Sequence, residues 1–378
     1  MYLRTRRYVV QVSGGLEPFI EREIAELGGT ELRRSVRAVE FTAGPAALYR
    51  VAYQSRFAGK LLAPIASFPA RHPDELYKRA KAVAWEELMA PDATFAIFAN
   101  VSDSRIHHSQ FAALRLKDAI ADRFRRDSGR RPSVDREAPQ YGLSLHVRSD
   151  RATIALDIGG GALYRRGYRL RAGEAPMQEI LAAGLVRFSG WDGARPLVDP
   201  MCGSGTLLAE AFMLAARIPA GYLRQHAAIE RLPGFDAALW AATRHAADAA
   251  ITEVPDGLVS GSDRDGAAVR MALDNLARLP GGERVSVEQR DVARAAGVRR
   301  GVLVVNPPYG LRIGGDAALD ATYAELGRLI AERCPGSTAV VYSADAALLS
   351  ALRVPVAERR SLTNGGLKGT AVKLLVPA

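Results

Sequence analysis

The chain has 378 residues, of which 48% are hydrophobic and 24% charged, so two or three globular domains with sizeable cores are expected. No apolar run approaches the roughly 18 residues of a membrane span, and the stretch after the basic N-terminus is too short for a signal peptide, so we expect a cytoplasmic protein without a membrane partner. Two isolated cysteines, Cys202 and Cys334, exclude a disulfide framework and a zinc spacing, and the formal net charge of +10 favours an acidic partner.

The first 160 residues alternate between strand and helix patterns, which predicts two α+β regions. We expect residues 1–60 to form a ferredoxin-like unit and residues 61–160 a second unit that ends near three glycines, 159–161. The first unit has predicted strands at 8–12 and 36–42 and helices at 16–27 and 46–53. The second has predicted helices at 72–85 and 108–126 and strands at 60–68, 94–102, 141–148 and 151–158, the last two as a hairpin.

Positive charge concentrates in the N-terminal part of the chain. Residues 1–170 hold 28 Lys and Arg against 19 Asp and Glu, whereas residues 171–378 hold 23 against 22. A phosphate-bearing partner favours this asymmetry, although an Arg-rich proteome would also produce it. In the predicted helix 108–126, Phe111 and Leu114 belong to the apolar face. The other face carries five basic residues that we expect to meet nucleic acid: Arg115, Lys117, Arg123, Arg125 and Arg126.

Two later segments have open roles. The stretch from Tyr164 to Arg169 interleaves basic and aromatic residues, and it can either contact nucleic acid or pack two domains together. The stretch from Ile218 to Pro255 is longer than a simple β-α-β connection needs and is predicted to be a helical insertion. It can shape a nucleic-acid cleft, but packing of its aromatic residues in a core is the stronger expectation.

A glycine-rich turn follows a short apolar strand that ends at Asp199. The order strand, Gly203-x-Gly205, helix is typical of the nucleotide side of a doubly wound sheet. No Lys follows the glycines, which excludes a P-loop, and Leu208 takes the third glycine position of a dinucleotide fingerprint. An acid, three residues and then Gly-x-Gly is the S-adenosylmethionine pattern, although a lone Gly-x-Gly is often only a turn.

Two more acids stand where strands are predicted to end. Asp263 closes the strand 258–263, and a single carboxylate there can accept hydrogen bonds from both hydroxyls of a ribose. Asp291 closes the strand 285–291 and can accept from an adenine amino group. Taken alone, each acid is more often a helix cap or a solvated turn residue.

Asn306-Pro307-Pro308-Tyr309 follows the apolar run 301–305, which predicts a buried parallel strand. An exocyclic amino group of a nucleobase is a poor nucleophile, because its lone pair is delocalised into the ring. The Asn306 oxygen and the Pro307 carbonyl can each accept one of its hydrogens and aim the lone pair at a methyl donor. Tyr309 can stack on a base taken out of its helix. The alternative is that Asn-Pro-Pro forms only a tight turn.

Residues 197–206, Leu-Val-Asp-Pro-Met-Cys-Gly-Ser-Gly-Thr, together with Asn-Pro-Pro-Tyr-Gly at 306–310, resemble class I S-adenosylmethionine-dependent methyltransferases that act on guanine N2 of structured RNA. Residues 100–159 resemble a THUMP RNA-binding domain. The similarity covers nearly the whole chain and is greatest to the N-terminal half of the fused bacterial enzyme that methylates large-subunit (23S) ribosomal RNA. Leu311 departs from that family, which often has an acid there.

The resemblance implies an α/β fold: a Rossmann-like seven-stranded sheet at 165–378 with its last strand antiparallel, after the ferredoxin-like and THUMP regions. It implies S-adenosylmethionine as donor, S-adenosylhomocysteine as product, and no metal. The donor residues would be Asp199, Met201, Cys202, Gly203, Gly205, Thr206, Asp263, Asp291 and Asn306, and the catalytic ones Asn306, Pro307, Pro308 and Tyr309.

We expect N2-methylguanosine in 23S ribosomal RNA. Transfer RNA as substrate, adenine N6 as the target, and an inactive RNA-binding assembly factor stay open. The oligomeric state is also open, with a monomer as the expectation.

Overall fold

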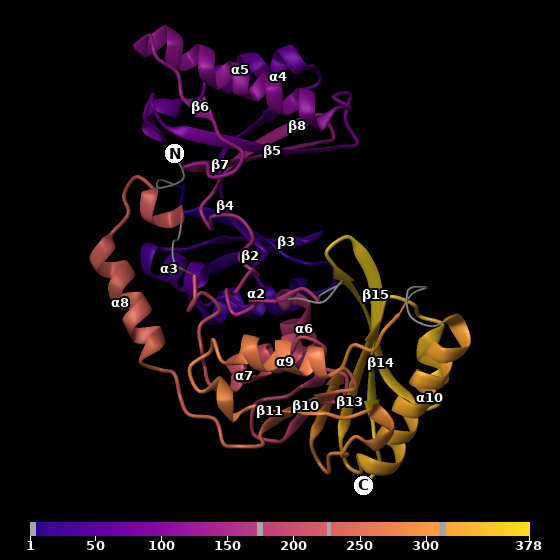
Figure 1. The fold of residues 1–378 in the computed structure, drawn as a ribbon. Helices are drawn as coiled ribbons and strands as arrows, with labels where there is room; N and C mark the ends of the chain where they lie inside the picture. Colours follow the sequence, from indigo (N-terminus) through magenta and orange to yellow (C-terminus); the bar gives the residue numbers. More distant parts are fainter. Residues whose placement is uncertain (1–4, 172–176, 225–227, 310–314) are drawn as a thin grey trace.

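The computed structural model describes residues 5–171, 177–224, 228–309 and 315–378. The described strands form two sheets (Figure 1). The N-terminal sheet has the order β2-β3-β1-β4-β8-β7-β5-β6 and the C-terminal sheet the order β11-β10-β9-β12-β13-β15-β14. Among the described residues no helix combines the length and the hydropathy that a membrane crossing requires.

The ferredoxin-like part pairs four strands, one of them shared with the next part, and carries two helices. Strand β1 (Arg7–Gln11) lies between β3 (Ala38–Thr42) and β4 (Lys60–Pro69), and β2 (Thr30–Ser35) forms the outer edge. Helix α2 (Glu17–Glu26) buries Ile20 and Ile24, and α3 (Pro45–Gln54) follows β3. The prediction missed β2 and began the next strand at Val36, which lies in the turn between β2 and β3 and is 77% exposed.

The second part continues the same sheet, because β4 pairs with β1 at one end and with β8 (Arg151–Asp157) along most of its length. A division after residue 60 therefore falls at the start of a shared strand. Strands β7 (Tyr141–Arg148), β5 (Thr94–Ser102) and the two-residue β6 (Ser133–Val134) complete the sheet. Helices α4 (Pro73–Lys81) and α5 (Ser109–Ser128) lie together on one side of it, and the 3₁₀ turn η1 (Trp85–Glu87) connects α4 to β5 (Figure 1).

The basic residues expected on one face of helix 108–126 take part in ion pairs. All five of its cations lie close to carboxylates: Arg115 to Asp74 (2.6 Å), Lys117 to Asp118 (2.9 Å), Arg123 to Glu86 (2.6 Å), Arg125 to Asp122 (2.9 Å) and Arg126 to Asp127 (2.6 Å). Phe111 and Leu114, expected on the buried face, are 48% and 47% exposed. The helix thus presents two apolar side chains to solvent, and Arg115 and Arg123 bind it to α4 and η1.

The C-terminal sheet has five parallel strands followed by an antiparallel hairpin, which confirms the predicted class I arrangement. Its parallel strands are β11 (Ser286–Gln289), β10 (Val259–Asp263), β9 (Leu197–Asp199), β12 (Val302–Val305) and β13 (Thr338–Ser343). Strand β15 (Leu367–Leu375) runs antiparallel to β13 and to β14 (Val356–Asn364). All four residues of β12 are buried, as expected for a parallel strand that is covered on both faces.

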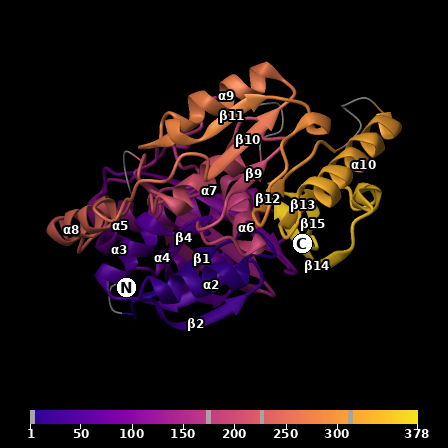
Figure 2. The same ribbon diagram turned by 90° about the horizontal axis from the view of Figure 1, so that it is seen from below.

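Helices cover both faces of this sheet (Figure 2). They are α6 (Glu179–Ser189), α7 (Thr206–Ala215), α9 (Gly266–Leu276) and α10 (Gly315–Arg333), with 3₁₀ turns η3 (Gly282–Arg284), η4 (Val292–Arg294) and η5 (Leu348–Leu352). The expected helix at 346–352 is only the turn η5, and the expected helix start at Pro176 lies outside the described residues.

The segment from Tyr164 to Arg169 joins the two halves of the molecule, by which we mean the parts built around the N-terminal and the C-terminal sheet. Arg166 is fully buried and its Nε donates to Glu210 Oε1 of α7 at 3.2 Å. A second bond runs from Arg166 to the carbonyl of Arg56 in the ferredoxin-like part. Arg56 in turn donates to the carbonyl oxygens of Met213 (2.8 Å) and Ile218 (2.7 Å). Buried charge therefore joins the halves, and the nucleic-acid alternative for Arg166 is excluded.

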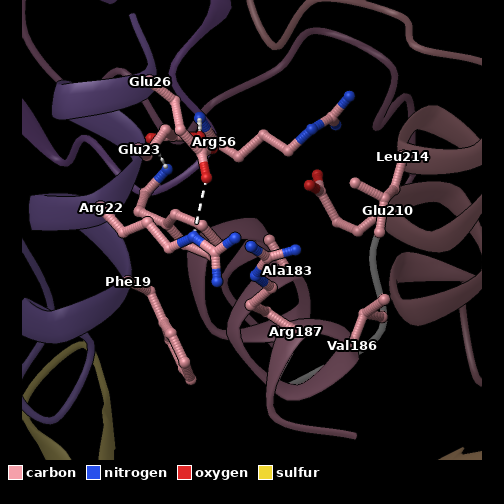
Figure 3. Close-up of a pocket in the computed structure, with 11 residues that line it drawn as sticks. Phe19, Arg22, Glu23, Glu26, Arg56, Ala183, Val186, Arg187, Glu210 and Leu214 are labelled. Carbon is pink, nitrogen blue, oxygen red and sulfur yellow. Dashed lines mark hydrogen bonds and ion pairs between the residues drawn. The ribbon is translucent and has the colours of Figure 1, made fainter. Parts of the chain in front are cut away.

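A small cavity of about 150 Å³ lies beside this joint, between α2 on one side and α6 and α7 on the other. Figure 3 shows Glu210 and Arg56 reaching toward one another across it. Glu210 Oε2 and Arg56 Nη1 are buried and make no hydrogen bond within the described chain.

The insertion 218–255 is helical, as predicted, and docks on the ferredoxin-like part. It contains the 3₁₀ turn η2 (Ala228–Arg231) and helix α8 (Ala237–Asp248), which packs on α3. The Trp240 ring lies 5.5 Å from that of Tyr49 and 5.9 Å from that of Tyr53, and Tyr53 donates to Asp248 at 2.7 Å. Its aromatic residues therefore form a core between the two halves.

Candidate active site

A cavity of about 540 Å³ opens at the carboxyl ends of the parallel strands. Its volume lies within the range of small-molecule sites, and ligands of open α/β sheets bind at this edge. Five residues singled out in the sequence line it: Met201, Asp263, Asp291, Asn306 and Pro308. The wall also includes Arg264, Asp265, Ala268 and the α10 residues Thr322 and Glu325. Nothing in the sequence marked the two α10 residues, because α10 reaches the cavity only through the fold.

The glycine-rich turn joins β9 to α7 beside this cavity. Gly203 has φ +52° and open space where a side chain would stand, so its backbone can approach a ligand. Gly205 has φ +79°, and a Cβ there would lie 2.9 Å from the Cβ of Ala272 on α9. Gly205 is therefore needed for close packing of two helices, whereas Gly203 is the position open to a ligand.

Asp199 lies beneath the turn and is 1% exposed. The pKa of its carboxyl is raised to about 8, mainly by burial; a hydrogen bond from the Met201 N–H (3.1 Å) opposes the rise, and the charge of Asp263 adds to it. A cation bound nearby would favour the ionised form. Cys202 is buried as well, and burial together with these two carboxylates raises the pKa of its thiol. Thr206 Oγ1 accepts from Arg169 at 3.1 Å and does not line the cavity.

Asp263 and Asp291 both lie on the cavity wall at strand ends. Asp263 Oδ2 accepts from the Gly203 N–H at 2.9 Å and Oδ1 from the Asp265 N–H at 3.0 Å. Asp291 Oδ1 accepts from the Ala293 N–H at 3.0 Å, so it caps η4. Each carboxylate oxygen has a second lone pair, so these bonds leave acceptor capacity toward a ligand.

Asn306 offers a buried acceptor at the end of β12. Its Oδ1 atom is buried and has no hydrogen-bond partner among the residues that the structure describes. A buried acceptor of this kind costs free energy unless a ligand or water donates a hydrogen bond to it. It therefore marks a point where a hydrogen-bond donor is expected. Pro307 is buried, and the half-buried Tyr309 ring meets Tyr342 edge-on at 6.5 Å. Gly310, Leu311 and Arg312 lie outside the described residues.

Asn275, which is 1% exposed in α9, was not predicted from the sequence. Its Nδ2 donates to the carbonyl oxygens of Ser204 (2.9 Å) and Arg171 (3.1 Å), and its Oδ1 accepts from the Leu170 N–H (2.8 Å). It therefore ties the glycine-rich turn to the segment that links the two halves. An amide on the buried face of an amphipathic helix was the only available hint.

Within the described ranges, no group of three or more His, Cys, Asp or Glu side chains is arranged to hold a metal ion.

Comparison with known proteins agrees with this geometry. Residues 166–373 match the family described as RMKL-like, methyltransferase domain, residues 70–157 match the THUMP domain, and residues 7–62 match the RlmL ferredoxin-like domain. The ribosomal RNA large subunit methyltransferase K/L of Syntrophotalea carbinolica is 38% identical over 94% of this chain and 51% of its own length. The chain thus spans about half the length of that curated relative.

Two solved structures share the whole fold. A candidate methyltransferase complexed with SAH has a TM-score of 0.87 and 27% identity, with 98% of each chain covered. A protein of Listeria monocytogenes described as a predicted N6-adenine-specific DNA methylase has a TM-score of 0.88 and 26% identity, with coverage of 100% of this chain and 98% of that one. Since the methyltransferase-domain match extends over more than half of the sequence, the chain belongs to the RMKL-like methyltransferase family, with ferredoxin-like and THUMP domains ahead of the catalytic fold.

Proposed function

We propose that this protein transfers a methyl group from S-adenosylmethionine to guanine N2 of large-subunit ribosomal RNA, forming N2-methylguanosine and S-adenosylhomocysteine. The observation that carries the proposal is Asn306 Oδ1, which has no hydrogen-bond partner among the described residues and lies on the same cavity as Asp263 and Asp291. A donor with a ribose and an adenine fits those two carboxylates, and an amino group fits the unpartnered oxygen.

The donor supplies an electrophilic methyl group on a positively charged sulfur. Asp263 would hold the ribose hydroxyls, and Asp291 would hold the adenine amino group. The glycine-rich turn around the donor would be formed by Met201, Cys202, Gly203 and Thr206. Asp199 would lie near the methionine end, where its carboxylate would face a cation. Gly205 contributes by seating α7 against Ala272.

Asn306 Oδ1 and the Pro307 carbonyl would accept the two hydrogens of the target amino group, and Tyr309 would stack on its base. As the new C–N bond forms and the C–S bond breaks, the electron pair stays on sulfur, which becomes a neutral thioether. The methylated nitrogen then releases one proton to solvent, so no strong general base is required. Because the Asn306 contact strengthens as the nitrogen pyramidalises, it acts mainly in the transition state.

The relative from Syntrophotalea carbinolica supports ribosomal RNA as the substrate, and the match to a THUMP domain supports RNA binding by residues 61–160. Adenine N6 is the second candidate, because its amino group fits the same clamp and the Listeria structure bears that description.

Parallel incubations of the full chain with labelled donor and either unmodified 23S transcript or unmodified transfer RNA, each followed by digestion to nucleosides, test the choice. Recovery of N2-methylguanosine is expected. N6-methyladenosine alone would overturn the guanine assignment, incorporation only into transfer RNA would favour that substrate, and no transfer to any RNA would favour an inactive assembly factor.

A further inference from the structure

The shape of the glycine-rich turn beside the cavity depends on side chains outside the turn. Gly203 and Gly205 flank Ser204 with φ of +52° and +79°, a region that glycine adopts without the steric penalty that other residues meet. The orientation of the Ser204 peptide group therefore has to be fixed by external bonds. Asp263 of β10 accepts from the Gly203 N–H at 2.9 Å, and Asn275 of α9 donates to the Ser204 carbonyl at 2.9 Å.

Asn275 uses every hydrogen-bonding group of its amide. Its Nδ2 donates to the carbonyl oxygens of Ser204 (2.9 Å) and Arg171 (3.1 Å). Its Oδ1 accepts from the N–H groups of Leu170 (2.8 Å) and Arg171 (3.3 Å). An amide has two N–H donors and two acceptor lone pairs, so both are fully used. An aliphatic side chain or an ionised Asp at this buried position could not make the same set of bonds.

Arg169 contacts the turn at its other end, where α7 begins. Its Nη2 donates to Thr206 Oγ1 at 3.1 Å and to the Met177 carbonyl at 2.7 Å, just before α6. Glu179, the first residue of α6, lies 3.6 Å from the same guanidinium and balances its charge. The segment that joins the halves thus reaches the turn directly as well as through the α9 amide.

We propose that Asn275 and Arg169 are positioning residues for the methyl donor: they hold the glycine-rich turn in the shape that binds it. This rests on the proposed function, which assigns the turn to the donor. Neither residue is among the described ones that line the cavity, so both act through the turn. Asp263 holds the turn from the proposed ribose side, and Asn275 and Arg169 hold it from the segment that joins the halves.

Titration of the full chain with S-adenosylhomocysteine tests the role of Asn275. Asn275→Ala should weaken binding about 2- to 30-fold, the range for residues that modulate a site without touching its ligand. The KM for S-adenosylmethionine should rise by a similar factor, whereas kcat at saturating donor and the KM for RNA should stay at their wild-type values. A purely structural role would not separate these quantities.

Ser337→Ala is the matched control. Ser337 Oγ donates to the Val298 carbonyl at 2.7 Å and accepts from the Gly301 N–H at 3.0 Å, and both bonds are buried. They lie at the amino end of β13, whereas the cavity opens at the carboxyl ends of the strands. Ser337→Ala should therefore lower the melting temperature without weakening donor binding.

Variants of Arg169 test the second contact. Arg169→Met removes the bonds to Thr206 and Met177 and should weaken S-adenosylhomocysteine binding. Arg169→Lys keeps a cation that can donate to one of the two acceptors, so it should recover part of the affinity. Unchanged affinity in a folded Asn275→Ala protein, or a loss no greater than that of Ser337→Ala, would overturn the inference. If Asn275→Ala does not fold, unchanged affinity of Arg169→Met would overturn it.

Failure of the proposed function is distinguishable in the same titrations. A wild type that binds S-adenosylhomocysteine but methylates no RNA would refute the proposed activity, while the affinities of the variants would still decide the positioning role. A wild type that does not bind S-adenosylhomocysteine would overturn both the donor site and the inference.

Discussion

Asp263 accepts a hydrogen bond from the Gly203 N–H at 2.9 Å, across a separation of 60 residues in the sequence. The carboxylate proposed to hold the donor's ribose therefore also holds the glycine turn that faces the donor. The two roles are compatible, because one carboxylate can accept several hydrogen bonds. They also mean that the turn and the ribose site are formed together.

Replacing Asp263 with Ala should weaken donor binding by roughly 2–3 kcal/mol, the range for loss of charge-assisted bonds. The loss includes both the ribose contact and the anchor of Gly203. Isothermal titration with S-adenosylhomocysteine measures it, and Asp265→Ala, a nearby lining carboxylate of the same cavity, is the control. An unchanged affinity in a folded Asp263→Ala protein would refute the ribose role.

Donor affinity should rise with pH because of Asp199. Its pKa of about 8 in the free protein means that the carboxyl is largely protonated at neutral pH. A cationic donor favours the carboxylate, so binding releases a proton, and affinity should increase by at most about tenfold per pH unit up to about pH 8 and then level off. Titrations across this range in buffers of different ionisation enthalpy measure the proton release. Asp199→Asn should flatten the profile, and an unaltered profile in that variant would contradict the assignment.

The same group should affect folding in the opposite direction. The folded pKa lies above the unfolded value of about 3.9, so the contribution of Asp199 to stability is fully present below about pH 4 and is lost as pH rises through about 8. Without donor, Asp199→Asn should therefore gain stability over the wild type as pH rises through this window. Urea unfolding at several pH values checks this, and a constant difference between the two proteins would contradict it.

The C-terminal fold could be predicted because its strands are local apolar runs, such as Val302–Val305, that end in polar residues. Parallel strands bring those ends to one edge, so Asp263, Asp291 and Asn306 were placed together by topology alone. Strand β2 was missed because five of its six residues are exposed and it shows no alternating pattern.

Properties that depend on distant partners could not be predicted. Arg166 is a surface-type residue whose burial requires Glu210, which lies on α7, far along the chain. Likewise the pairing of Arg115 and Arg123 of α5 could not be predicted, because their partners Asp74 and Glu86 come from other elements. Charge counts by sequence segment do not reveal such pairing.

The buried Arg166–Glu210 pair should be essential to the joint between the halves. Both side chains have zero exposure, so Glu210→Ala leaves an uncompensated buried guanidinium and should cost about 3–5 kcal/mol of unfolding free energy. Glu26→Ala, which breaks the exposed pair with Arg22, should cost less than about 1 kcal/mol. Denaturant unfolding measures both. The double variant Arg166→Met/Glu210→Leu should recover part of the lost unfolding free energy. Equal losses in Glu210→Ala and Glu26→Ala would show that the buried pair stabilises the protein no more than the exposed pair does.

Asn306→Ala should nearly abolish turnover while leaving donor affinity and stability close to those of the wild type. The Oδ1 atom has no partner within the described chain, so its removal breaks no bond of the folded protein. What is lost is the acceptor for the target amino group, a contact that strengthens in the transition state and therefore appears in kcat. Single-turnover rates with labelled donor and RNA measure the loss, and melting temperature with calorimetry verifies that fold and donor site are intact. A variant that retains more than about a tenth of the rate, a barrier change under about 1.4 kcal/mol, would count against Asn306 as the amino-group acceptor.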